Sequence, residues 1–152
     1  MTNSEEGVRF EKSGTLKLYL NTMKTIYIFG NPLLSFDSLP IRLAPQLEKL
    51  FPEIKFVVKD PNENLKPENG ELYIIDTVLG IKKVEVITDL EKIQLDKIYS
   101  AHDFDLGFNL KLLQKIGELK KVVIFGVPDK ISKKEALNQL SEELNKFNFQ
   151  KM

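Results

Sequence analysis

Short apolar segments alternate with segments of helical character along most of this sequence. Four segments are rich in β-branched and aromatic residues, as buried strands are: 25–30, 54–58, 72–76 and 121–128. Three others can place apolar side chains along one face of a helix: 39–51, 106–116 and 133–147. Apolar strands joined by helices are typical of parallel sheets covered by helices. We therefore predict an α/β fold, namely a three-layer α/β/α sandwich with a mostly parallel central sheet.

Several residues suggest where these elements begin and end. Ser38 can cap the helix 39–51, in which Pro40 fits the first turn. Pro45 either kinks this helix or marks its true start. Gly117 is expected to end the helix 106–116. The segment "KVEVI" (83–87) alternates apolar and polar residues and so predicts an edge strand.

The chain of 152 residues is 42% hydrophobic, which suits one globular domain. Its first part differs from the rest, because "MTNSEEG" is polar and "VRFEKSGTLKLYL" alternates around Ser13-Gly14 as a hairpin would. We interpret residues 1–22 as a peripheral or disordered leader and residues 23–152 as a single α/β domain. Met23, directly before the first strand, is an alternative start of the functional chain.

Composition excludes several classes of function. The 22 Lys and Arg balance the 22 Asp and Glu, so no basic field indicates nucleic acid or a membrane surface. The absence of cysteine excludes disulfides, thiolate metal sites and a cysteine nucleophile. The N-terminus is too charged for a signal peptide, and no apolar run approaches the roughly 20 residues that span a bilayer. We expect a soluble, cytoplasmic monomer.

Three residues with metal-binding side chains stand near the predicted strand ends. Asp37 follows the first strand after the turn "GNP", Asp76 is the last residue of the third strand, and His102 lies in a loop before a helix. Ligands of open α/β sheets bind outside the carboxyl ends of the strands. Two carboxylates and one imidazole would suit a divalent transition metal and leave coordination positions open.

Each of these residues also has a purely structural interpretation. Asp37 can assist Ser38 at the start of a helix, where an acid is favoured by the helix dipole. Asp76 can form a turn through Thr77, and His102 can be an ordinary histidine of a surface loop. Spacing alone favours these structural roles, because isolated acids and histidines are seldom ligands.

Four motifs taken together resemble the hydrogenase maturation protease family in order and spacing. They cover roughly residues 24–130 and read "IFGNPLLSFDSLP", "LYIIDTVLG", "SAHDFDLGFNLKLL" and "VVIFGVPD". Members of that family have a three-layer α/β/α fold and remove a C-terminal extension from the large subunit of nickel–iron hydrogenases after nickel insertion. The family's three metal-contacting positions fall on Asp37, Asp76 and His102.

The resemblance implies that the partner is a hydrogenase large-subunit precursor. It also implies that nickel is carried by this substrate rather than bound permanently. Three protein ligands leave positions at which such a metal can be shared with the precursor. Either Asp37 or Asp76 activates water for the cleavage, or the substrate's metal polarises the peptide carbonyl. Both mechanisms remain open at this point.

The sequence departs from the family pattern in three places. Phe36 replaces the first of two adjacent acids, Pro40 replaces a glycine, and "DPNEN" (60–64) stands where the family has a Gly-Gly-Thr or Gly-Gly-Ser stretch. Those glycines allow close approach of a substrate peptide. A non-catalytic, metal- or partner-binding relative is therefore the alternative, and a small-molecule-binding domain without a metal is a weaker third possibility.

Overall fold

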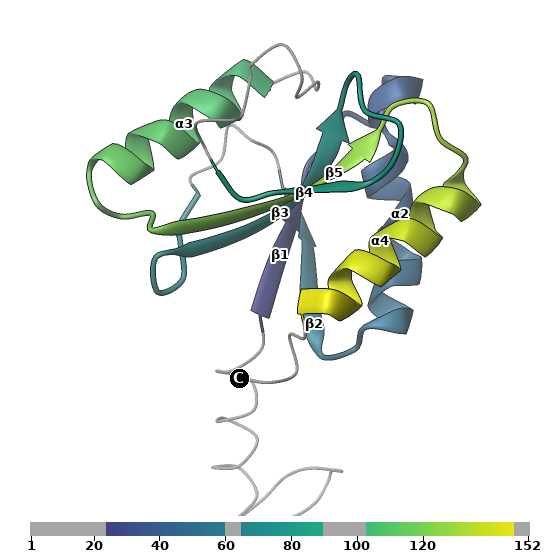
Figure 1. Ribbon diagram of the computed structural model, residues 1–152, viewed down its shortest axis with the longest axis horizontal. Coiled ribbons are helices and arrows are strands. Elements are labelled where there is room, and N and C mark those ends of the chain that lie inside the picture. The colour runs from purple at the N-terminus through teal and green to yellow at the C-terminus, as the bar shows by residue number, and fades with distance from the viewer. Residues whose placement is uncertain (1–23, 60–64, 90–102, 148–152) are drawn as a thin grey trace, which may run out of the picture.

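The structure is a computed structural model that describes residues 24–59, 65–89 and 103–147. Within these residues, five strands form one sheet, and three α-helices and one short 3₁₀ helix accompany them (Figure 1). The strands are β1 (Lys24–Ile28), β2 (Ile54–Val58), β3 (Glu71–Val78), β4 (Glu85–Ile87) and β5 (Lys121–Pro128). The helices are η1 (Ser35–Asp37), α2 (Leu39–Leu50), α3 (Asp103–Lys115) and α4 (Lys133–Phe147).

The order of strands across the sheet is β2-β1-β3-β5-β4. Strands β1, β2, β3 and β5 are parallel, whereas β4 pairs antiparallel with β5 at the edge. The α/β class, the mostly parallel sheet and the edge strand within 83–87 are therefore confirmed. The longest pairing joins β3 to β5 over eight positions, from Glu71 opposite Lys121 to Val78 opposite Pro128.

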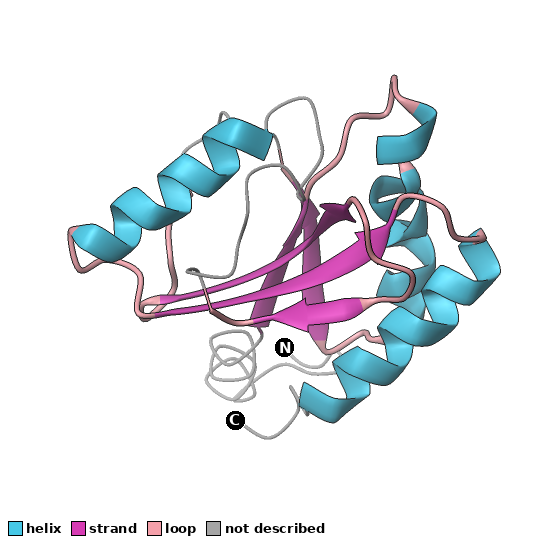
Figure 2. Ribbon diagram, turned by 45° about the horizontal axis from the view of Figure 1, so that its top comes forward, coloured by secondary structure: helices cyan, strands magenta, loops and turns pink. Residues whose placement is uncertain are grey.

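Successive residues of the strands contribute to two separate hydrophobic cores, since side chains alternate between the faces of a sheet. Ile75 and Phe125 lie in the core that includes leucines of α2 and α4. Ile74 and Ile124 lie in the other core, which includes Leu110 of α3. Figures 1 and 2 both show α2 and α4 on one side of the sheet and α3 on the other.

Each of the three α-helices buries leucines against the sheet. Leu43 and Leu47 of α2 and Leu140 and Leu144 of α4 are buried between these helices and the sheet. Leu110 of α3 is buried as well. None of the helices in the described parts of the chain has both the length and the apolar character needed to cross a bilayer.

The ends of the helices confirm one sequence prediction and correct another. Gly117 ends α3 in the left-handed conformation (φ 84°), and the N–H of Glu118 donates to the carbonyl of Leu113, as in a Schellman motif. Ser38 directly precedes α2, as predicted for its N-cap residue. Its side chain, however, makes no capping hydrogen bond to the backbone of the described first turn of α2. The Ser38 hydroxyl instead donates to the carbonyl of Ser35 (3.3 Å) and accepts from Arg42 Nε (3.2 Å).

Two further sequence predictions have mixed outcomes. Pro45 lies inside α2 and does not mark its start, because the helix already begins at Leu39. The leader 1–22, the start at Met23 and the segment 60–64 lie outside the described residues, so these interpretations stay predictions.

Candidate functional site at the carboxyl end of the sheet

The order of the strands reverses direction beside β1. From β1 the chain passes to β2 on one side, and the next strand, β3, lies on the other side of β1. Such a topological switch point creates a crevice at the carboxyl ends of the two strands, which is where open α/β sheets bind ligands. Asp37 follows β1, and Asp76 lies near the end of β3, so both acids belong to this end of the sheet.

Asp76 is an internal residue of β3, whereas the sequence predicted it as the last residue of the strand. It lies opposite Gly126 of β5, in the row of residues whose side chains face α3. The carboxylate is completely buried, and its Oδ1 accepts a hydrogen bond from the N–H of Thr77 (2.8 Å). The contact with Thr77 that the structural interpretation expected is therefore present, but it lies within a strand and not in a turn.

Gly126 allows close packing next to Asp76. A Cβ at this position would lie 2.7 Å from Cγ2 of Val78, which is far inside van der Waals contact. Val78 and Asp76 are two residues apart on β3 and thus face the same side of the sheet. The missing side chain of Gly126 therefore leaves room for the side chain of Val78, the next residue after Asp76 on this face of β3.

Asp37 is fixed by the loop that leaves β1. Its carbonyl accepts a hydrogen bond from the N–H of Asn31 (3.0 Å), and its own N–H donates to the carbonyl of Leu34 (3.0 Å). The loop thus folds back so that its end lies beside its beginning. Like Asp76, Asp37 is completely buried.

Gly30 makes this folding back possible. A Cβ at Gly30 would lie 2.6 Å from the carbonyl oxygen of Asp37 and 3.2 Å from Cγ1 of Ile41. The nearest obstacle is backbone, which cannot rotate away as a flexible side chain can. The sequence pattern "GNP" indicated a tight turn, but it did not show that Gly30 is needed for the position of Asp37.

The burial of both carboxylates has an electrostatic consequence. Moving an ionised carboxylate out of water costs several kcal/mol even after the protein relaxes. Asp37 and Asp76 are both completely buried, and they lie toward the carboxyl ends of β1 and β3. Carboxylate oxygens are ligands for divalent metal ions, which is the role that the sequence predicts for both acids.

The third predicted ligand, His102, lies outside the described residues. Within the described parts of the chain, no group of three His, Cys, Asp or Glu side chains is close enough to hold a metal ion. The structure thus locates two members of the predicted set, and the ligand role of all three residues stays a prediction. Ser38 makes no side-chain capping bond at the start of α2, and the structural role of Asp37 at this helix stays an interpretation.

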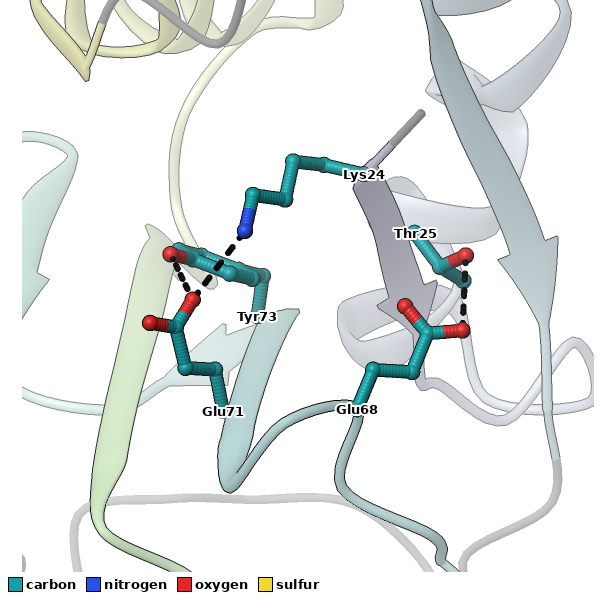
Figure 3. Close-up of polar contacts among 5 residues, drawn as sticks. All are labelled: Lys24, Thr25, Glu68, Glu71 and Tyr73. Atoms are coloured by element: carbon teal, nitrogen blue, oxygen red, sulfur yellow. Dashed lines mark hydrogen bonds and ion pairs between the residues drawn. The ribbon is translucent and has the colours of Figure 1, made fainter. Parts of the chain in front are cut away.

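A different polar cluster lies at the amino ends of the same strands (Figure 3). Lys24 Nζ forms an ion pair with Glu71 Oε1 (3.2 Å), and the hydroxyl of Tyr73 donates to the same oxygen (2.8 Å). The ammonium groups of Lys24 and Lys121 lie 5.6 and 5.8 Å from the centre of the Tyr73 ring. Nearby, the hydroxyl of Thr25 contacts Glu68 at 3.5 Å.

The contacts of this amino-end cluster shift two pKa values in opposite directions. The hydrogen bond from Tyr73 is the largest cause that lowers the pKa of the Glu71 carboxyl, and Lys24 adds to it. Burial raises the pKa of the Tyr73 hydroxyl, and the Glu71 carboxylate raises it further. Both shifts favour the charge states in which this hydrogen bond exists.

Comparison with known proteins leaves the family of the chain open. No family model matches the sequence, and no match is found among curated proteins. Among solved structures, the chain is similar to an uncharacterized protein from Wolinella succinogenes. The two share 15% sequence identity with a TM-score of 0.47, over 83% of this chain and 94% of the other.

Proposed function

We propose that the chain is an endopeptidase that removes a C-terminal extension from the large subunit of a nickel–iron hydrogenase after nickel insertion. The observation that carries this proposal is the location of Asp37 and Asp76, completely buried at the carboxyl end of the two strands that flank the switch point. The order of the sequence motifs supports the same function, and it adds His102 as the third ligand.

In this proposal the nickel arrives as part of the substrate. Asp37 and Asp76 supply carboxylate oxygens and His102 supplies an imidazole nitrogen, a mixed set of the kind that transition metals accept. Three ligands leave coordination positions for the precursor's own ligands. Because the chain contains no cysteine, it lacks the soft thiolates that would compete with the precursor for the metal.

The complete burial of the two carboxylates constrains the mechanism. A substrate metal can reach Asp37 and Asp76 only after the atoms that cover them move aside, since neither residue has accessible surface. One of the acids then accepts a proton from the attacking water, or the substrate's metal polarises the carbonyl.

The same burial also favours a second candidate function, a non-catalytic domain that binds a metal or a partner protein. A protein of that kind needs no water or peptide within reach of Asp37 and Asp76. The loss of the family's glycine stretch at 60–64 points in the same direction.

An assay of precursor processing separates the two functions. The purified chain is incubated with a nickel-loaded large-subunit precursor encoded by the same genome, and the mass of the precursor is measured. The proposed endopeptidase produces a shortened subunit from the nickel-loaded precursor and none from the nickel-free precursor. Binding of the loaded precursor without any shortened product would establish the binding domain instead.

A further inference from the structure

The hydrogen-bonded ladder between β1 and β3 stops at the carboxyl end of the sheet. Its register ends at the pair Ile28–Ile75, where the N–H of Phe29 donates to the carbonyl of Ile75 (2.9 Å). In a regular parallel ladder, the next bond would run from the N–H of Thr77 to the carbonyl of Phe29. The bond after it would run from the N–H of Asn31 to the carbonyl of Thr77.

Both of these donors bond elsewhere. The N–H of Thr77 donates to Oδ1 of Asp76 (2.8 Å). The N–H of Asn31 donates to the carbonyl of Asp37 (3.0 Å). The two strands therefore part at the switch point, and the carbonyls of Phe29 and Thr77 face the gap between them.

The side chain of Thr77 lies at the same gap, on the face of the sheet that α2 and α4 cover. Its neighbours on this face, Ile75 and Val127, belong to the core beneath these helices. Thr77 is only 1% exposed, and its Oγ1 forms no hydrogen bond with any residue that the structure describes. A buried hydroxyl without a partner costs free energy, so a group of this kind is expected to gain its partner on binding.

We propose that Thr77 binds an extended peptide segment that enters the gap between β1 and β3. The Thr77 hydroxyl donates to a backbone carbonyl of this segment, and the Thr77 carbonyl accepts from one of its N–H groups. Main-chain groups hold an added strand in the same manner. The inference rests on the proposed function, in which the segment is the part of the precursor next to the cleaved bond. Like the two acids, Thr77 becomes reachable only when the atoms that cover it move aside.

The test compares Thr77→Val with Thr77→Ser in the processing of the nickel-loaded precursor. Valine has nearly the shape of threonine but no hydroxyl, so Thr77→Val should raise KM roughly tenfold with kcat within about twofold. Thr77→Ser keeps the hydroxyl, and its KM should stay within about threefold of the wild-type value. Thr88→Val makes the same exchange at an exposed threonine after β4 and should change neither parameter. If the wild type binds the precursor without cleaving it, dissociation constants replace KM.

Urea unfolding of the chain without precursor separates a binding role from a structural one. Thr77→Val should unfold at the wild-type urea concentration or above it, because no hydrogen bond to a described residue is lost. A clearly lower midpoint would show that the hydroxyl already has a partner in the free chain, which overturns the inference. An unchanged KM or dissociation constant in Thr77→Val would also overturn it, while the proposed function stands. A wild type that neither cleaves nor binds the precursor would contradict both.

Discussion

The two ends of the parallel strands hold acidic side chains in different surroundings. At the amino end, the side chain of Glu71 is 30% exposed and accepts hydrogen bonds from Lys24 and Tyr73 (Figure 3). At the carboxyl end, Asp37 and Asp76 have no accessible surface at all. The amino-end acid remains partly hydrated, whereas the carboxyl-end acids are fully removed from water.

This difference indicates what each end contributes. A half-exposed ion pair adds at most modest stability and costs little to maintain. Burying a carboxylate costs free energy that its contacts must offset, and residues kept despite such a cost are expected at functional sites. We propose that the carboxyl-end acids serve the function and that the amino-end cluster serves the stability of the sheet, and the following predictions test this proposal.

The largest effect is expected for the acids of the candidate site. Asp37→Asn, Asp76→Asn and His102→Ala should each reduce processing of the nickel-loaded precursor by roughly 100-fold or more. Even groups that only orient metal ligands contribute about 10–100-fold to activity. The matched control is Glu71→Gln, which neutralises a carboxylate at the opposite end of β3 and should leave processing unchanged. If Glu71→Gln and Asp76→Asn lost processing activity to the same degree, the functional difference between the two ends of the sheet would be contradicted.

The next effect concerns the glycine that positions Asp37. Gly30→Ala should lower the free energy of unfolding by about 1–3 kcal/mol, because the new Cβ meets the backbone of Asp37. Processing should fall with it, since the displaced backbone carries Asp37. Urea unfolding and the precursor assay measure the two quantities.

Gly117→Ala provides the matched comparison for Gly30→Ala. Its Cβ meets nothing within 4 Å, but its left-handed backbone should cost about 1–2 kcal/mol of stability. Processing by Gly117→Ala should remain at the wild-type level. Normal processing by Gly30→Ala would show that the loop position does not matter for activity.

A smaller effect is expected at the amino end. Tyr73→Phe removes the hydrogen bond to Glu71 and should lower the free energy of unfolding by about 1 kcal/mol without changing processing. Urea unfolding at neutral pH gives the value. A large loss of processing in this variant would mean that the two ends of the sheet are coupled.

The smallest effect is a dependence of stability on pH. The pKa of Glu71 is lowered from its ordinary value of 4.5, so the folded protein favours the ionised carboxyl. The resulting stability is present above pH 4.5 and is lost as the pH falls toward the lower pKa of the folded state. Because Glu71 is partly exposed, we expect only a few tenths of a kcal/mol. The difference in unfolding free energy between wild type and Glu71→Gln should shrink as the pH falls below 4.5. A difference that stays constant would contradict the lowered pKa of Glu71.

Much of the fold follows from the sequence because its periodicities are simple. The apolar runs at 54–58 and 121–128 match β2 and β5 residue for residue, and the leucine spacing of 133–147 matches α4. The end of β3 was placed two residues early, since Asp76 reads as a strand end. Only the pairing with β5 shows that the strand continues to Val78.

The candidate site follows less completely. That Asp37 and Asp76 lie toward the carboxyl ends of β1 and β3 could be predicted, because parallel strands end at the same edge of a sheet. Their complete burial could not, since it depends on atoms distant in sequence. The role of Gly30 was hidden as well, because a close approach between Gly30 and the carbonyl of Asp37 leaves no local pattern.

The division between the two ends is tested most directly by the free energy of unfolding of Asp76→Asn, measured in urea beside Glu71→Gln. The asparagine keeps an oxygen that can accept the bond from the N–H of Thr77, and it carries no charge at any pH. If Asp76 is retained for function, Asp76→Asn is at least as stable as the wild type, whereas Glu71→Gln is less stable by up to about 1 kcal/mol. A loss of more than about 3 kcal/mol in Asp76→Asn would show instead that the buried acid holds the fold together, and the assignment of this end to function would be wrong.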